Sequence, residues 1–142
     1  MVSGNEIVAI ARTYVGTPWH HTARLKKIGI DCAGLLVCVF REAGYDIEDE
    51  VHYSLQDEYK LLQQYLDINT VKVSAEDVLP GDIVVFRARL MHNHVGILTG
   101  EGTFIHAYNS PSVKRVVEQE YDDSWQMRAV EYRRVREDLW RQ

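Results

Sequence analysis

Cys32 is the residue of this chain whose type and position are best suited to chemistry. Asp31 is a typical helix N-cap, and apolar residues recur at helical spacing after it, so Cys32 is expected in the first turn of a helix. The partial positive charge of a helix N-terminus favours a thiolate, which is a nucleophile at neutral pH. A buried packing residue is the alternative for any single cysteine. Cys38 lies in the middle of the same predicted helix, and we interpret it as packing.

Two histidines could supply the base that a cysteine nucleophile needs. His94 and His106 lie on two predicted strands that are joined by a short glycine-rich turn around Glu101. If the strands pair symmetrically about Glu101, Gly96 lies opposite His106, and the two histidines are diagonal neighbours on one face. A shift of the register by one residue would place them on opposite faces. With a cysteine helix packed against the sheet, the symmetrical register predicts a Cys–His–His constellation.

A metal site is the alternative use of the same side chains. His92 and His94, with His106 or Cys32, are residue types that zinc prefers as ligands. Those two histidines point the same way only if strand pairing extends back to Met91, and the residues before His92 are typical of a loop. The interpretation without a metal is therefore favoured.

The elements that must position these residues divide the chain into two halves. The first half predicts three helices, and the second half predicts an antiparallel meander with a turn or short helix near Asp122. The first helix is expected to begin at the capping box Ser3-Gly4-Asn5-Glu6 and to end at Gly16. The second begins after the N-cap Asp31 and ends at Gly44, and the third lies between Ser54 and Asn69. Strands are expected at residues 83–86, 94–99, 103–108, 113–117 and 127–135. This order indicates an α+β fold.

Length and composition limit the classes of function. A chain of 142 residues with 46% hydrophobic and 26% charged residues is typical of one globular domain, residues 1–142. The net charge of −5 argues against a nucleic-acid partner, and no apolar run approaches the roughly 18 residues of a membrane span. The N-terminus lacks the pattern of a secretory signal, and two cysteines cannot form a disulfide framework. We expect synthesis in the cytoplasm with free thiols.

Five segments of the chain resemble, in order, the motifs of the NlpC-type cell-wall cysteine peptidases, which are papain-like. They are Tyr14-Val15-Gly16-Thr17-Pro18-Trp19, Asp31-Cys32-Ala33-Gly34-Leu35, Leu79-Pro80-Gly81-Asp82-Ile83-Val84-Val85-Phe86, His94-Val95-Gly96-Ile97 and Phe104-Ile105-His106-Ala107. Each motif alone is weak. Five in the same order over residues 14–108 form a specific resemblance.

This resemblance implies a fold and an activity. The fold would be papain-like, with N-terminal helices packed on a C-terminal antiparallel sheet of about five to six strands. The activity would be hydrolysis of peptidoglycan stem peptides, between D-glutamate and diaminopimelate or lysine, through a thioester acyl-enzyme and without a cofactor. Cys32 would be the nucleophile, His94 the general base and acid, and His106 the residue that orients His94. The expected substrate-binding residues are Tyr14, Trp19, Asp31 and Ala33.

Some segments depart from the family pattern. Trp19 stands where the family has a tyrosine, Ala33 replaces a common serine, and the loop Arg24-Leu25-Lys26-Lys27 is basic. Trp19 and this loop are similar to the phage-tail and prophage branch of the family, which implies delivery by tail-tip proteins. We expect residues 19–30 to shape the cleft, with Arg24, Lys26 and Lys27 binding substrate carboxylates. A solvated basic loop is the alternative.

Two other functions remain open at this point. A thiol amidase or acyltransferase of the same architecture would differ only in its pocket. A structural component of a phage tail assembly would not need Cys32 or His94, and both residues are present.

Overall fold

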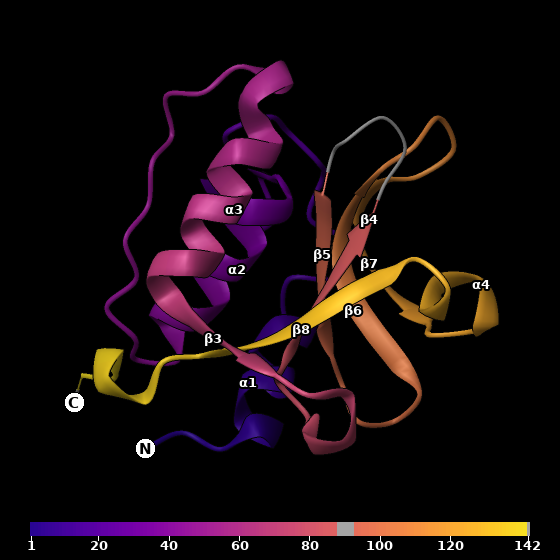
Figure 1. Cartoon of the computed structure of the whole chain (residues 1–142). Helices are drawn as coiled ribbons and strands as arrows, with labels where there is room; N and C mark the ends of the chain where they lie inside the picture. The colour runs from indigo at the N-terminus through magenta and orange to yellow at the C-terminus, as the bar shows by residue number, and fades with distance from the viewer. Residues whose placement is uncertain (88–92, 142) are drawn as a thin grey trace.

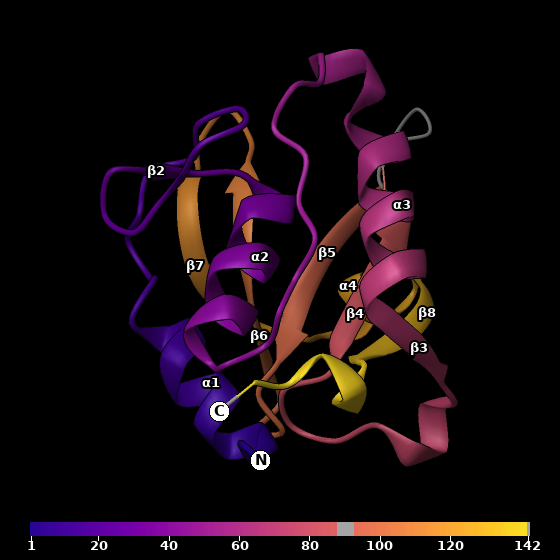
Figure 2. The ribbon, with the colours of Figure 1, turned by 90° about the vertical axis from the view of Figure 1, so that its left-hand side faces the viewer.

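The computed structural model describes residues 1–87 and 93–141, which form a layer of helices packed on an antiparallel sheet. Figures 1 and 2 show α2 (Cys32–Glu42) and α3 (Glu58–Asn69) on one face of the sheet, and Figure 1 shows the short α4 (Asp123–Gln126) on the other. The N-terminal helix α1 (Gly4–Arg12) packs against α2 and the sheet. The α+β architecture expected from the sequence is confirmed.

The sheet has six strands in the order β3-β8-β4-β5-β6-β7, and every neighbouring pair is antiparallel. Its strands are β3 (Thr70–Val73), β4 (Ile83–Arg87), β5 (Asn93–Leu98), β6 (Thr103–Asn109), β7 (Lys114–Glu120) and β8 (Ala129–Val135). The sequence missed β3, which follows α3 without a turn. It also missed the small hairpin of β1 (Arg24–Leu25) and β2 (Gly29–Ile30), which was expected to be loop.

The predicted caps begin the first two helices. The Ser3 hydroxyl accepts from the Glu6 backbone N–H at 3.1 Å, and the Glu6 carboxylate accepts from the Ser3 N–H at 3.2 Å. Asp31 caps α2 by accepting from the Gly34 N–H at 2.8 Å. The α1 helix ends at Arg12 and continues as turns, so it is shorter than the stop at Gly16 predicts.

The hydrophobic core divides into two clusters, because successive side chains of a strand point to opposite faces of the sheet. On one face, the helices bury Val95, Ile97 and Ile105. The other face carries a smaller cluster that is closed by α4, with the members Val84, Phe86, Leu98, Phe104 and Trp125. The strands β5 and β6 contribute to both clusters.

Three elements begin at the same end of the molecule. Figures 1 and 2 show the starts of α2, α3 and β5 together at the upper end, reached through the β1–β2 segment and the connection between α2 and α3. A 3₁₀ turn, Leu55–Asp57, leads into α3. No helix among residues 1–87 and 93–141 is long and apolar enough to span a membrane.

Candidate active site

Cys32 is the first residue of α2, and its side chain is buried. Its thiol donates a hydrogen bond to Oε1 of Glu58, the first residue of α3, at 3.5 Å. The sequence reasoning did not single out Glu58, because only the packing of α3 beside α2 brings its carboxylate to the sulfur. The beginnings of two helices therefore meet at the proposed nucleophile.

The surroundings of Cys32 hold it in the thiol form. Burial, together with the charges of Glu58 and Asp31, raises the pKa of the Cys32 thiol well above its ordinary value. The Ala33 backbone N–H hydrogen bonds to the sulfur and acts in the opposite direction. The sequence predicts a thiolate stabilised by the helix N-terminus. Burial and the two carboxylates act against that stabilisation.

The two histidines form a hydrogen-bonded relay with a glutamine. His94 Nε2 lies 2.7 Å from His106 Nδ1, and His106 Nε2 lies 2.8 Å from Gln119 Oε1. The strands β5 and β6 pair Ile97 with Ile105, which is the register symmetrical about Glu101. The predicted shared face is therefore confirmed.

Gln119 determines which nitrogen of each imidazole carries the proton. Its carbonyl oxygen only accepts, so His106 Nε2 must donate to it. In a neutral imidazole, His106 Nδ1 is then the acceptor for an N–H on His94 Nε2. His94 Nδ1 consequently has a free lone pair and is the basic atom of the relay. The sequence reasoning missed Gln119, although its position on the strand beside β6 follows from the β6–β7 pairing.

The histidine pair lies within an aromatic cluster. The ring centroid of Trp125, in α4, lies 5.2 Å from that of His106 and 6.4 Å from that of His94. The ring centroid of Phe104 lies 4.4 Å from that of His106. Burial lowers the pKa of His106 to about 4. Burial, His106 and the charge of Arg128 lower the pKa of His94 well below its ordinary value. Both imidazoles are therefore neutral at pH 7, as a general base requires.

The structure brings Cys32 and His94 to the same end of the molecule without joining them. The α2 helix packs against β5 and β6, and Cys32 and His94 lie at the upper ends of α2 and β5. Within the described part of the chain, the sulfur and the imidazole form no hydrogen bond with each other. The sulfur instead contacts Glu58.

Asp31 is fully buried, and its carboxylate is occupied within the chain. One oxygen accepts from the Gly34 N–H and from Arg24, both at 2.8 Å. The other accepts from the Thr22 N–H at 2.9 Å and from the Tyr53 hydroxyl. A carboxylate offers about four lone-pair sites, so none remains for a substrate. Asp31 thus organises the first turn of α2, and the sequence expectation that it binds substrate needs correction.

The sequence model of the NlpC/P60 family matches residues 16–134 of this chain, which include Cys32, His94 and His106. The chain belongs to the NlpC/P60 family.

Individual bacterial proteins are similar to most of this chain. The murein DD-endopeptidase MepS/murein LD-carboxypeptidase of Escherichia coli strain K12 is 34% identical over 110 residues, 77% of this chain and 51% of that protein. The gamma-DL-glutamyl hydrolase of Bacillus subtilis strain 168 is 28% identical over 130 residues, 90% of this chain and 28% of that protein. The chain therefore spans about half or less of the length of these two relatives.

A solved structure has the same fold. The crystal structure of an NlpC/P60 family protein from Bacillus cereus ATCC 10987 superposes with a TM-score of 0.71 at 18% identity. The match covers 94% of this chain and 40% of that one. At this identity the likeness shows the fold alone, and it confirms the papain-like architecture that the motifs imply.

The other substrate residues expected from the NlpC/P60 motifs lie in different places. The Tyr14 hydroxyl donates to Glu42 at 2.9 Å, at the end of α2 opposite to Cys32, so the structure does not bring Tyr14 to the sulfur. Ala33 is 1% exposed and has no surface for a ligand. Trp19 is partly buried, bridges to Ile30 just before Asp31, and keeps a position at the edge of the site.

The basic loop is tied to the protein. Arg24 pairs with Asp31 and Asp49, and Lys26 pairs with Glu42 at 3.0 Å. Lys27 is exposed. The expectation that these three cations together receive substrate carboxylates is therefore not supported for Arg24 or Lys26, because each already neutralises an acidic side chain.

The metal alternative depended on His92, which lies outside the described residues. Among the residues that are described, no group of three histidine, cysteine or acidic side chains is close enough to hold an ion.

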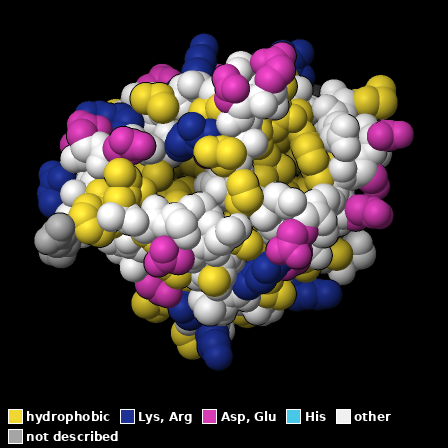
Figure 3. Space-filling model, turned by 90° about the horizontal axis from the view of Figure 1, so that it is seen from below, with side chains coloured by type: hydrophobic (Ala, Val, Ile, Leu, Met, Phe, Trp, Pro, Cys, Tyr) yellow, Lys and Arg dark blue, Asp and Glu magenta, His cyan; other side chains and the backbone are white. Residues whose placement is uncertain are grey.

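A cavity of 310 Å³ lies far from these residues. It is lined by residues at the end of β5, the β5–β6 turn and the η2 turn, Ala75–Asp77, whereas His94 lies near the start of β5. Figure 3 shows the lower face, where hydrophobic side chains gather around a hollow. The cavity is separate from the candidate active site.

Proposed function

We propose that this chain is a cysteine endopeptidase that hydrolyses peptidoglycan stem peptides through Cys32, His94 and His106. The bond would join the γ-carboxyl group of D-glutamate to diaminopimelate or lysine. The observation that carries the proposal is the His94–His106–Gln119 relay, because it leaves Nδ1 of His94 as the basic atom, on a strand that begins at the same end of the molecule as α2.

The proposed reaction begins with proton transfer. His94 Nδ1 takes the thiol proton as the Cys32 sulfur attacks the scissile carbonyl carbon. The N–H groups in the first turn of α2 are suited to stabilise the developing oxyanion. His94 then gives the proton to the leaving amine, the C–N bond breaks, and a thioester remains on Cys32. Water, deprotonated by His94, hydrolyses the thioester and restores the thiol.

The raised pKa of Cys32 affects the first step. A thiol and a neutral imidazole react by general-base catalysis, so proton transfer accompanies the attack. The Glu58 carboxylate must release the thiol before His94 can receive the proton. Binding of the substrate at Cys32 would bring about this exchange.

The choice of substrate is supported by the names of two relatives. One is named as a murein DD-endopeptidase and LD-carboxypeptidase, and the other as a gamma-DL-glutamyl hydrolase. The second name supports cleavage at a γ-glutamyl bond in particular.

Mass spectrometry of digested muropeptides tests the substrate and the bond. Purified stem peptides that end in diaminopimelate or lysine are incubated with the wild-type protein and with Cys32→Ala. We expect new termini at the γ-D-glutamyl bond with the wild type only. Cleavage at another bond, or equal cleavage by Cys32→Ala, would contradict the proposal.

We also propose that this protein belongs to the phage-tail or prophage branch and acts on the wall after delivery by a tail. Trp19 and the basic loop support this assignment. Immunogold labelling of tail tips from an induced lysogen that encodes the chain tests it. Label confined to the host cytoplasm would contradict it.

A further inference from the structure

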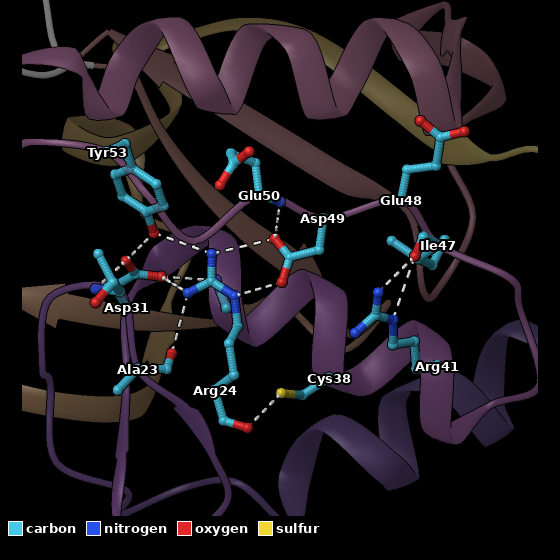
Figure 4. A network of polar contacts seen from close by, with 12 residues as sticks. Ala23, Arg24, Asp31, Cys38, Arg41, Ile47, Glu48, Asp49, Glu50 and Tyr53 are labelled. Atoms are coloured by element: carbon cyan, nitrogen blue, oxygen red, sulfur yellow. Dashed lines mark hydrogen bonds and ion pairs between the residues drawn. The ribbon is translucent and has the colours of Figure 1, made fainter.

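The carboxylate next to the nucleophile is connected to residues 46–54 by Arg24 and by the Tyr53 hydroxyl. Arg24 donates from Nη1 to Asp31 at 2.8 Å, and from Nε and Nη2 to Asp49 at 2.9 and 3.2 Å. Its Nη2 also donates to the Tyr53 hydroxyl at 3.0 Å, and that hydroxyl donates to Asp31. Figure 4 shows the guanidinium between these three side chains.

The network is enclosed by the protein. The exposed fractions of the Arg24, Asp31 and Asp49 side chains are 14%, 0% and 10%. Asp49 and Tyr53 belong to residues 46–54, the segment that connects α2 to the 3₁₀ turn before α3. Removing one partner of a buried ion pair strongly destabilises the fold, because the other charge stays buried without compensation. The geometry of this corner therefore depends on Arg24.

We propose that Arg24 is a positioning residue for Cys32: its guanidinium fixes and neutralises the Asp31 carboxylate, which caps α2 immediately before the sulfur, and ties it to residues 46–54. The assignment rests on the proposed function only in treating Cys32 as the nucleophile. Arg24 touches neither the sulfur nor the imidazoles, and it acts through Asp31.

Arg24 also affects the charge around the Cys32 thiol. Asp31 directly precedes Cys32 and Glu58 faces it from α3. His94 and His106 of β5 and β6 point to the other face of the sheet, against Trp125 of α4. The negative charges of Asp31 and Glu58 both raise the pKa of Cys32. Arg24 offsets the charge of Asp31, so its loss makes the thiolate harder to form.

The test measures the chemistry of Cys32 without a substrate. The rate of iodoacetamide addition to Cys32 is followed against pH by peptide mass spectrometry, which separates it from Cys38. Arg24→Met is expected to slow addition about tenfold at a fixed pH, since an uncompensated neighbouring charge shifts a pKa by one unit or more. The double variant R24M/D31N is expected to return to within about twofold of the wild type. Asp49 loses its partner in both variants, so their difference isolates the charge on Asp31.

A matched control removes another arginine that holds a buried aspartate. Arg134 pairs with Asp82 at 2.8 Å, and Asp82 is 2% exposed. Arg134→Met is expected to lower Tm, as Arg24→Met does, but to leave the pH profile of Cys32 unchanged. A merely structural role for Arg24 would make the two variants alike in both measurements.

Further outcomes test the positioning role of Arg24 separately from the proposed endopeptidase activity. If Arg24→Met does not fold, Tyr53→Phe removes one donor from Asp31 and is expected to slow addition about threefold. If Arg24→Met, or Tyr53→Phe in its place, adds iodoacetamide at the wild-type rate, the positioning role is overturned. It is also overturned if the rate does not recover in R24M/D31N. A shifted alkylation profile in a protein that cleaves no stem peptide would uphold this role while the proposed function fails.

Discussion

His94 and His106 share one hydrogen bond, and Gln119 determines its direction. In the proposed mechanism, His94 Nδ1 is therefore the atom that receives the thiol proton, and His106 holds the tautomer. The two histidines therefore have unequal roles: His94 is at the end of the relay and His106 is in its middle.

Substitutions of the two histidines are expected to differ. His94→Ala removes the base and should lower kcat by about 10³-fold, close to the effect of losing Cys32. His106→Gln keeps a side-chain hydrogen bond to His94 and should retain more activity than His106→Ala. Steady-state hydrolysis of a stem peptide measures all three. Equal losses for both His106 variants would mean that His106 does not orient His94.

Glu58 is expected to slow the formation of the thiolate. Glu58→Gln removes a charge that touches the sulfur, so the rate of iodoacetamide addition to Cys32 should rise about tenfold at fixed pH. Asp57→Asn is the matched control, since this neighbouring carboxylate contacts Ser54 and Lys60 instead. The same rate increase in both variants would show a general effect of net charge.

At this scale the sequence identified the candidate catalytic side chains but not the groups that control their ionisation. Cys32, His94 and His106 follow from residue type, helix position and strand register. The carboxylate of Glu58 and the carbonyl of Gln119 reach the site from other elements, through tertiary packing that no local pattern encodes. For the same reason, the occupied state of Asp31 could not be foreseen from its place before Cys32.

The β5–β6 hairpin is the element that assembles the relay, and its close strand packing depends on Gly96. A Cβ atom at this position would lie 2.7 Å from Cδ2 of Phe104 and 3.5 Å from Cβ of His106. The turn around Glu101 fixes the register, so a short glycine-rich signal was sufficient to predict which residues share a face. The strand β3 carried no such signal, because its four residues directly continue α3.

Gly96→Ala is expected to destabilise the hairpin. The added methyl group must displace the Phe104 ring, and overpacking of this kind costs about 1–3 kcal/mol in the free energy of unfolding. Urea denaturation measures this loss, with Val71→Ala on the exposed edge strand as a control within about 0.5 kcal/mol of the wild type. A free energy of unfolding equal to that of the control would show that the hairpin accommodates the added methyl group without loss of stability.

The whole molecule couples its stability to pH through the buried histidines. Their pKa values are lowered in the folded state, so the unfolded chain binds more protons as pH falls below the ordinary value of 6.5. The stabilising contribution of the neutral imidazoles is present above pH 6.5. It is lost progressively as pH falls toward about 4.

Denaturation at a series of pH values checks this coupling. We expect the free energy of unfolding to fall between pH 6.5 and 4, and to fall less steeply in His106→Gln, which has one titrating group fewer. Identical slopes for the wild type and this variant would show that His106 does not titrate in this range.

The most direct test of the proposed mechanism is detection of the acyl-enzyme. The protein is mixed with an activated ester of a γ-D-glutamyl stem peptide, quenched in acid within milliseconds to seconds, and mapped by mass spectrometry. The account predicts a transient mass increase equal to the acyl fragment on Cys32, absent in Cys32→Ala and accumulating more slowly in His94→Ala. Turnover of the ester with no adduct on Cys32, or with an adduct on Cys38, would contradict it.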